Sequence, residues 1–133
     1  MVKMFEMTPY DGTMAYAQNK RQQVEMTERW AVDHPAIHWS VMHPGWADTP
    51  AVRSAMPDFH AKMKDKLRSV EQGADTVVWL AISPAALQGE SGQFWQDRVP
   101  VSAHLPLAWT RVGQGERERL ISALEDFKEE FSE

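Results

Sequence analysis

A tyrosine and a lysine four residues apart, Tyr16 and Lys20, are the pair whose types and spacing best suit chemistry. On a helix this spacing brings both side chains to one face, one turn apart. An ammonium group beside a phenol favours the phenolate form, so the tyrosine can exchange a proton with a ligand near neutral pH. The spacing therefore predicts an acid/base pair. The plainer interpretation of Tyr16 is a helix tyrosine packed against a sheet.

A second candidate group follows the next apolar segment. The residues from Ala36 to His43 are rich in β-forming types and have proline on both sides, which predicts a strand buried on both faces. After it come Pro44-Gly45-Trp46 and then Thr49-Pro50, which has the pattern of a helix N-cap followed by proline in the first turn. Such a loop at the carboxyl end of a strand is typical of a ligand site. Trp46 is either a wall of that site or a surface aromatic residue.

Helices are expected around two strands. The residues from Thr13 to Val32 contain no glycine or proline and predict a long helix, capped by Asp11 or Thr13 and ended before Pro35. Further helices are expected over residues 50–55, 59–68, 72–83 and 116–131, with a second strand over residues 93–96 and a loop over residues 97–106. A capping box at residues 69–72 precedes a helix face expected to point inward: Val77, Val78, Leu80, Ala81 and Ile82. This alternation predicts an α/β fold with a parallel sheet.

Composition excludes several classes of function. The chain has 133 residues, 43% of them apolar, which predicts one domain with a core. The net charge of -5 argues against a nucleic-acid partner, and the basic run over residues 62–68 is expected to be a solvated helix face. The absence of cysteine excludes disulfides and thiolate chemistry. The longest apolar run, residues 77–82, is too short for a membrane span, and the first ten residues do not form a signal peptide; we expect a cytoplasmic protein.

The histidines do not predict a metal site. His38 and His43 are five residues apart on the expected strand and face opposite ways, so a packed histidine is expected at each position. His60 and His104 stand alone in the sequence and carry no signal. No metal ligand is therefore assigned.

The two candidate groups together resemble a known family. Tyr16-Ala-Gln-Asn-Lys20 on an expected helix, followed by Pro44-Gly-Trp-Ala-Asp-Thr49 at the end of an expected strand, resembles the carboxyl-terminal part of a short-chain dehydrogenase/reductase. Each motif alone is weak, but this order on these elements is specific. The resemblance runs from Pro9 through nearly the whole chain. It implies one partial domain over residues 1–133: the carboxyl-terminal part of a Rossmann-like parallel sheet flanked by helices.

The resemblance also implies a role for each candidate residue. It implies an NAD(P)-dependent oxidoreductase acting on a small-molecule carbonyl or alcohol. Tyr16 would transfer the proton to or from the substrate oxygen, and Lys20 would bind the nicotinamide ribose and favour the phenolate of Tyr16. The nicotinamide would contact the residues after the strand: the backbone of Pro44, Gly45 and Trp46, and the hydroxyl of Thr49.

Some parts that the family uses are missing from the sequence. No strand, glycine-rich turn and helix precede Tyr16, so the amino-terminal βαβ half that binds the cofactor pyrophosphate is lacking. The first serine is Ser40, so the upstream catalytic serine is missing too, and Thr13 is the hydroxyl residue one turn before Tyr16. We expect a truncated chain that is inactive alone. The alternatives are a non-catalytic chain that binds a protein or forms a homodimer through the helix from Thr13 to Val32, and a fragment without function.

Overall fold

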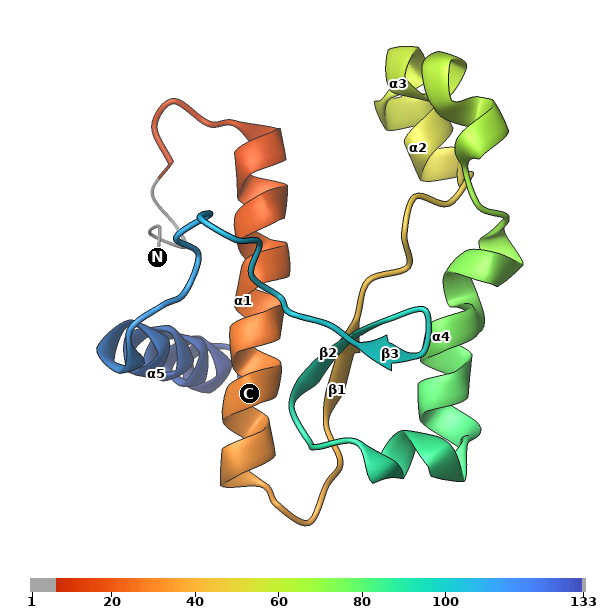
Figure 1. The fold of residues 1–133 in the computed structure, drawn as a ribbon. Helices are drawn as coiled ribbons and strands as arrows, with labels where there is room; N and C mark the ends of the chain where they lie inside the picture. The colour runs from red at the N-terminus through yellow and green to blue at the C-terminus, as the bar shows by residue number, and fades with distance from the viewer. Residues whose placement is uncertain (1–6, 133) are drawn as a thin grey trace.

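The computed structural model describes residues 7–132 and has an α/β architecture, as predicted (Figure 1). Two helices are confirmed closely, and three further helices begin two residues earlier than expected. In chain order the elements are α1 (Gly12–Asp33), β1 (Ser40–Met42), α2 (Pro50–Ala55), α3 (Pro57–Met63), η1 (Lys64–Lys66), α4 (Val70–Ile82), η2 (Pro84–Gln88), β2 (Gln93–Gln96), β3 (Val99–Pro100) and α5 (Gln114–Glu130).

The sheet is small and mixed. Its strand order is β1-β2-β3, with β1 parallel to β2 in the register Val41 opposite Phe94, and β2 antiparallel to β3. The parallel pairing is confirmed, whereas β3 falls where a loop was expected. Asp97 and Arg98 turn the chain between β2 and β3 with φ values of 53° and 61°. Hairpin turns of this kind usually carry Asn or Gly, so the sequence Asp-Arg gave no signal for the third strand.

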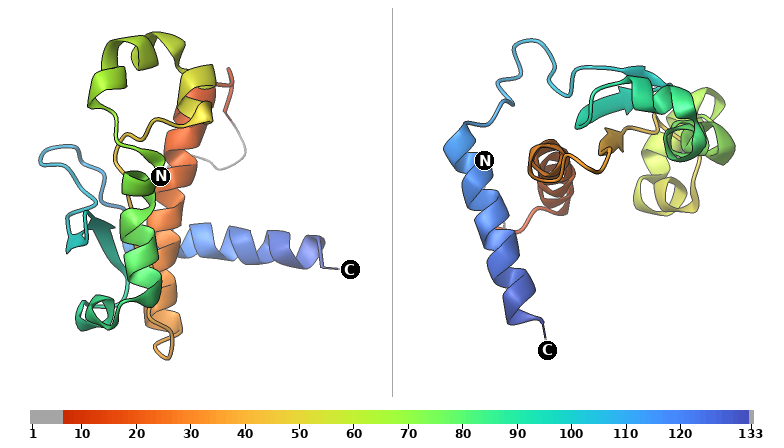
Figure 2. Two further views of the ribbon diagram at one scale, coloured as in Figure 1. Left: turned by 90° about the vertical axis from the view of Figure 1, so that its right-hand side faces the viewer. Right: turned by 90° about the horizontal axis from the view of Figure 1, so that it is seen from below.

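Helices lie on both sides of the sheet. Helices α1 and α4 flank it on opposite sides in Figure 1, and Figure 2 shows α5 beyond α1, on the side away from the sheet. This order places α1 between the sheet and α5. The first half of α1 and the connection after β1, which carry the two candidate groups, therefore belong to neighbouring parts of the fold.

Local capping residues explain where the helices begin. The Asp11 carboxylate accepts a hydrogen bond from the Met14 N–H at 2.9 Å, so Asp11 rather than Thr13 caps α1. Ser69 and Gln72 form the predicted capping box, with distances of 3.2 and 2.9 Å. Because Ser69 is the N-cap, α4 begins at residue 70 instead of 72. Helix α2 ends at Ala55, and Pro57 starts α3, where the missing N–H of proline costs nothing.

Two expectations about burial are wrong. Strand β1 has only three residues, and all of them are half-buried rather than buried on both faces. On α4 the buried residues are Gly73 and Thr76, and of the five residues expected to point inward only Leu80 is half-buried. A Cβ added at Gly73 would lie 3.0 Å from the Cβ of Ala47, so this glycine permits the close approach of the chain after β1. The apolar pattern in the sequence identified an apolar face of α4, but it did not show which face of this helix packs against the rest of the chain.

A buried carboxylate joins α5 to α1. The Glu25 side chain is fully buried and forms ion pairs with Arg21 of the same helix and with Arg117 of α5, whose Nε lies 2.7 Å from Glu25 Oε2. Arg117 also pairs with Glu28. A buried carboxylate needs such partners because the loss of its hydration is costly. The second half of α1 is thereby fixed from the side opposite the sheet.

We expect Glu25→Ala to lower the free energy of unfolding by about 3–5 kcal/mol, because it leaves two guanidinium groups without their shared buried partner. Urea denaturation followed by tryptophan fluorescence measures the change. Glu125→Ala is the matched control, because its Lys128 pair is exposed, with side chains 57% and 73% accessible, and should unfold like the wild type. Equal losses in the two variants would contradict the role of Glu25.

Candidate functional site

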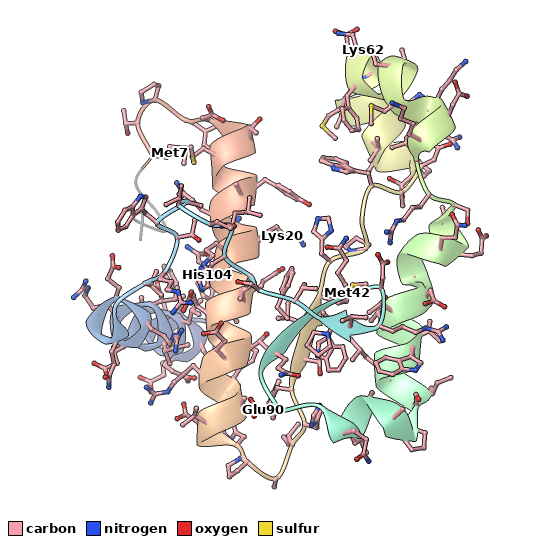
Figure 3. All side chains as sticks on the ribbon, viewed as in Figure 1. Met7, Lys20, Met42, Lys62, Glu90 and His104 are labelled. Carbon is pink, nitrogen blue, oxygen red and sulfur yellow. The ribbon has the colours of Figure 1, made fainter. Side chains whose placement is uncertain are left out.

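The first half of α1 brings Tyr16 and Lys20 together on an exposed face. Lys20 Nζ lies 5.6 Å from the centre of the Tyr16 ring and donates a hydrogen bond to Gln23 Oε1 at 3.3 Å. The Tyr16 residue is 64% exposed, so the interpretation as a tyrosine packed against the sheet is wrong. The lysine ammonium is attracted to the face of the ring. In Figure 3 the Lys20 side chain extends from α1 toward the connection between β1 and α2.

The residues after β1, numbered 44–49 and called the 44–49 loop below, start from a fixed point. The His43 N–H donates to the carbonyl oxygen of Trp95 at 2.9 Å, which extends the pairing of β1 with β2. The Gly45 N–H then donates to His43 Nδ1 at 2.9 Å. Gly45 has a φ of +72°, a conformation that glycine adopts without strain. His43 is exposed, so the packed histidine expected there is wrong, whereas His38 is half-buried.

Trp46 packs on one side only. Its ring centre lies 4.7 Å from that of Phe59 on α3, and 52% of the residue remains exposed. It therefore covers Phe59 while presenting an aromatic surface beside the loop.

Thr49 caps α2 as predicted. Its Oγ1 accepts a hydrogen bond from the Val52 N–H at 3.2 Å, and Pro50 occupies the first helical position. Because Oγ1 serves here as the acceptor, the hydroxyl hydrogen of Thr49 can still be donated to a ligand.

Asp48 joins the loop to the two short helices. Its carboxylate accepts two hydrogen bonds from Arg53 at 2.7 Å and lies 3.0 Å from His60 Nε2. The Arg53 guanidinium holds the pKa of Asp48 below its usual range. His60, which carried no signal in the sequence, is thus a structural partner of the loop.

Arg68 is the site residue that sequence analysis missed. The Arg68 N–H donates to the carbonyl oxygen of Trp46 at 2.8 Å, and its own carbonyl accepts from the Asp48 N–H at 2.9 Å. Its guanidinium pairs with Asp97 in the turn between β2 and β3. The expectation of a solvated helix face is therefore wrong at this position, since Arg68 follows η1 and contacts the loop. No local pattern could reveal partners so far away in the chain.

The structure does not join the two candidate groups directly. Within residues 7–132, no hydrogen bond, ion pair or ring contact links Tyr16 or Lys20 to the 44–49 loop. Thr13 is exposed one turn before Tyr16 and forms no hydrogen bond with it. The two groups are held by separate elements, α1 and the end of β1, which pack against each other.

His104 lies between α1 and the segment before α5. His104 Nε2 is 3.4 Å from Arg21 Nη2, and its Nδ1 is 2.9 Å from the Thr110 hydroxyl. Burial, followed by the positive charges of Arg21 and Arg111, lowers the pKa of His104. Among the described residues no group of three or more His, Asp or Glu side chains could hold a metal ion. Within residues 7–132, no helix has the length and apolar character needed to cross a membrane.

Comparison with known proteins decides the family. No protein-family model and no solved structure matches the chain. Over 126 residues it is 64% identical to dehydrogenase/reductase SDR family member 12 of Homo sapiens and 60% identical to the protein of that name in Bos taurus. The chain belongs to the short-chain dehydrogenase/reductase family. The resemblance drawn from Tyr16, Lys20 and the 44–49 loop is therefore confirmed.

The alignments cover most of this chain but less than half of each relative. Both alignments cover 95% of this chain but 40% of each relative, so the chain spans about 40% of the length of these proteins. A more distant relative from Streptomyces sp. (strain C5), named as a daunorubicin C-13 ketoreductase, is 32% identical over 99 residues, which are 70% of this chain and 33% of that protein. These proportions agree with a carboxyl-terminal part of a short-chain dehydrogenase/reductase domain.

We expect Gly45→Ala to lower the free energy of unfolding by about 1–3 kcal/mol, because alanine is strained at positive φ. The added Cβ would also lie 2.7 Å from Arg68 Nε. Gly115→Ala is the control, since its nearest neighbour outside the helix backbone is 3.9 Å away, and alanine favours the helix there. Thermal unfolding followed by circular dichroism compares the two. A Gly45→Ala protein as stable as wild type would show that the loop adopts another conformation.

Proposed function

We propose that this chain carries the proton-transfer and nicotinamide-binding segment of an NAD(P)-dependent oxidoreductase that interconverts a carbonyl compound and an alcohol. The pairing of Lys20 with Tyr16 on an open face of α1 carries the proposal. Family membership supports it, as does the relative named as a ketoreductase, which makes a ketone a reasonable class of substrate.

Each residue of the pair has a distinct task in this proposal. The bound cofactor would supply or accept a hydride at the substrate carbon. The Tyr16 hydroxyl donates its proton to the substrate oxygen as the carbonyl becomes an alcohol, and the phenolate takes a proton back in the reverse direction. The Lys20 ammonium, held beside the Tyr16 ring, donates hydrogen bonds to the ribose hydroxyls. An exposed phenol suits this task because a ligand can reach it.

The 44–49 loop fits the nicotinamide end of the cofactor. Gly45 gives the loop its positive-φ turn, Trp46 offers an aromatic surface, and the Thr49 hydroxyl retains a hydrogen to donate. The pyrophosphate end is different, because residues 7–132 contain no strand, glycine-rich turn and helix in succession. We therefore propose that this segment works within a longer protein and is inactive alone.

A second candidate is a non-catalytic chain that pairs with another protein or with a second copy through α1. Met14 and Tyr16 are exposed large side chains on the first half of this helix. The second half is already covered within the chain, since Gln22, Val24, Glu25 and Thr27 are buried. An interface on α1 would therefore use its first half, which also carries Tyr16 and Lys20.

Tyr16→Phe tests the proton-transfer role in a form of the protein that spans the full length of its relatives. We expect turnover to fall about 10²–10⁴-fold, because the ring is kept but no proton can be donated. The dissociation constant for NAD(P)H should stay near that of the wild type. Tyr10→Phe, which changes the other tyrosine of the chain, is the matched control and should keep full turnover. Undiminished turnover in Tyr16→Phe would remove the proposed role.

Titration of the purified chain with NADPH or NADH, followed by the fluorescence of its six tryptophans, tests whether the segment works alone. We expect no saturation below about 1 mM, because the pyrophosphate lacks its usual anchor. Saturation in the micromolar range would overturn the proposed inactivity. Sedimentation velocity on the same sample tests the second candidate, since a monomer at every concentration would exclude a homodimer through α1.

A further inference from the structure

We propose that Arg68 is a positioning residue that fixes the conformation of the 44–49 loop, with Asp97 holding the Arg68 guanidinium for this task. The loop's conformation can be measured without a ligand. The consequence for dinucleotide binding rests on the proposed function and is tested separately.

Arg68 contacts the loop through both of its backbone polar groups. Its N–H donates to Trp46 and its carbonyl accepts from Asp48, at 2.8 and 2.9 Å, so that Ala47 and Arg68 form an isolated parallel bridge. Ala47 between them is buried. The chain before α4 thus pairs with the middle of the loop as a short strand would, and this pairing sets the register between the two segments.

The side chain of Arg68 acts on the first part of the loop. The guanidinium and the adjoining carbon lie against Gly45, where an added Cβ would be 2.7 Å from Nε, 2.8 Å from Cζ and 3.0 Å from Cδ. Nη1 also lies 3.4 Å from the carbonyl oxygen of Pro44. The Arg68 side chain therefore fills the space beside the positive-φ glycine and limits the conformations available to its backbone.

Asp97 holds that guanidinium from the opposite side. Its two carboxylate oxygens accept from Nη1 and Nη2 of Arg68, the latter at 2.8 Å, in a planar two-bond pairing. This pairing holds the pKa of Asp97 below its usual range. The next residue, Arg98, donates its N–H to Thr76 Oγ1 at 3.2 Å and pairs its side chain with Asp75. The hairpin turn is thus attached to α4, and Arg68 is held against a fixed support.

The solvent exposure of Arg68 and Asp97 determines whether the loss of their pairing affects the loop alone or the stability of the whole chain. The Arg68 and Asp97 side chains are 32% and 54% accessible, and exposed ion pairs contribute little to global stability. The β1 and β2 strands are held independently by the Trp95 carbonyl and its buried ring. Loss of the Arg68 side chain should therefore loosen the loop locally while the sheet stays folded. A merely structural residue would instead lower protection throughout the chain.

A fixed loop matters because its residues are those proposed to contact the nicotinamide. If the binding conformation is only one of several, the apparent dissociation constant rises in inverse proportion to the fraction of the protein that has this conformation. A loop ordered beforehand avoids that cost on binding. Arg68 would thus act on affinity through Pro44, Gly45 and Trp46 rather than by touching the ligand.

Amide hydrogen exchange on the purified chain tests the positioning claim directly. In Arg68→Ala we expect the amides of Gly45 and Asp48 to exchange on the order of 10-fold faster, with α4 and the β1–β2 pair unchanged. Arg68→Lys keeps the charge but lacks the planar two-bond geometry, so its exchange rates at these amides should lie between those of the wild type and of Arg68→Ala. Asp97→Asn should raise the exchange rates of these amides less than Arg68→Ala does. It should cause no further increase when combined with Arg68→Ala, because Asp97 acts through Arg68.

Asp75→Asn is the matched control, since it breaks the neighbouring pair with Arg98 on the same turn without touching the loop. It should leave exchange at Gly45 and Asp48 unchanged. Equal loosening in Asp75→Asn would show that only the hairpin matters, and unchanged exchange in Arg68→Ala would overturn the proposal.

Binding in the full-length form then tests the consequence for the ligand. We expect Arg68→Ala to raise the NAD(P)H dissociation constant about 10-fold while turnover at saturation stays near wild type. A faster-exchanging loop with an unchanged dissociation constant would overturn the link to binding. A wild-type full-length protein that bound no dinucleotide would overturn the proposed function instead, and the exchange data alone would then decide the role of Arg68.

Discussion

The parallel pairing of β1 with β2, centred on Trp95, is the interaction on which the rest of the arrangement depends. Trp95 is 3% exposed, lies opposite Met42 and contacts Trp79 of α4 with ring centres 5.5 Å apart. Its carbonyl oxygen receives the His43 N–H. Trp95 therefore links the sheet to α4 and to His43, the residue that precedes the 44–49 loop. With few large apolar side chains fully buried in the described part of the chain, this contact contributes a large share of the cohesion.

The site is built from two parts with different mechanical support. Tyr16 and Lys20 belong to α1, whose second half lies between the sheet and the Arg117 contact of α5. The 44–49 loop has no helix of its own and takes its conformation from His43, Arg68 and Asp48. A helix holds a proton donor in a fixed position, and a loop fixed by hydrogen bonds can present its backbone to a flat ring. The division matches the two tasks proposed for them.

Signals contained within a few residues of the sequence predicted the structure well. The cap at Asp11, the capping box at Ser69 and the Thr49-Pro50 helix start all hold, because each depends on bonds across three residues. The Tyr16–Lys20 pairing holds for the same reason, since one helical turn determines it. Features that depend on distant partners were missed. Strand β3, the buried side of α4 at Gly73 and the role of Arg68 depend on segments that are separated along the chain, and local composition does not encode them.

The turn between β2 and β3 joins a negative and a positive residue, each paired with the opposite charge: Asp97 with Arg68, and Arg98 with Asp75. The four charges sum to zero, so dissolved salt acts on these pairs by screening rather than by neutralising a net field. The apolar contact of Trp95 with Trp79 responds in the other direction, because salts such as sulfate strengthen apolar burial. A rising concentration of sulfate therefore weakens the ion pairs that support the loop while strengthening the apolar contacts of the sheet, so this salt separates the mobility of the site from the stability of the fold.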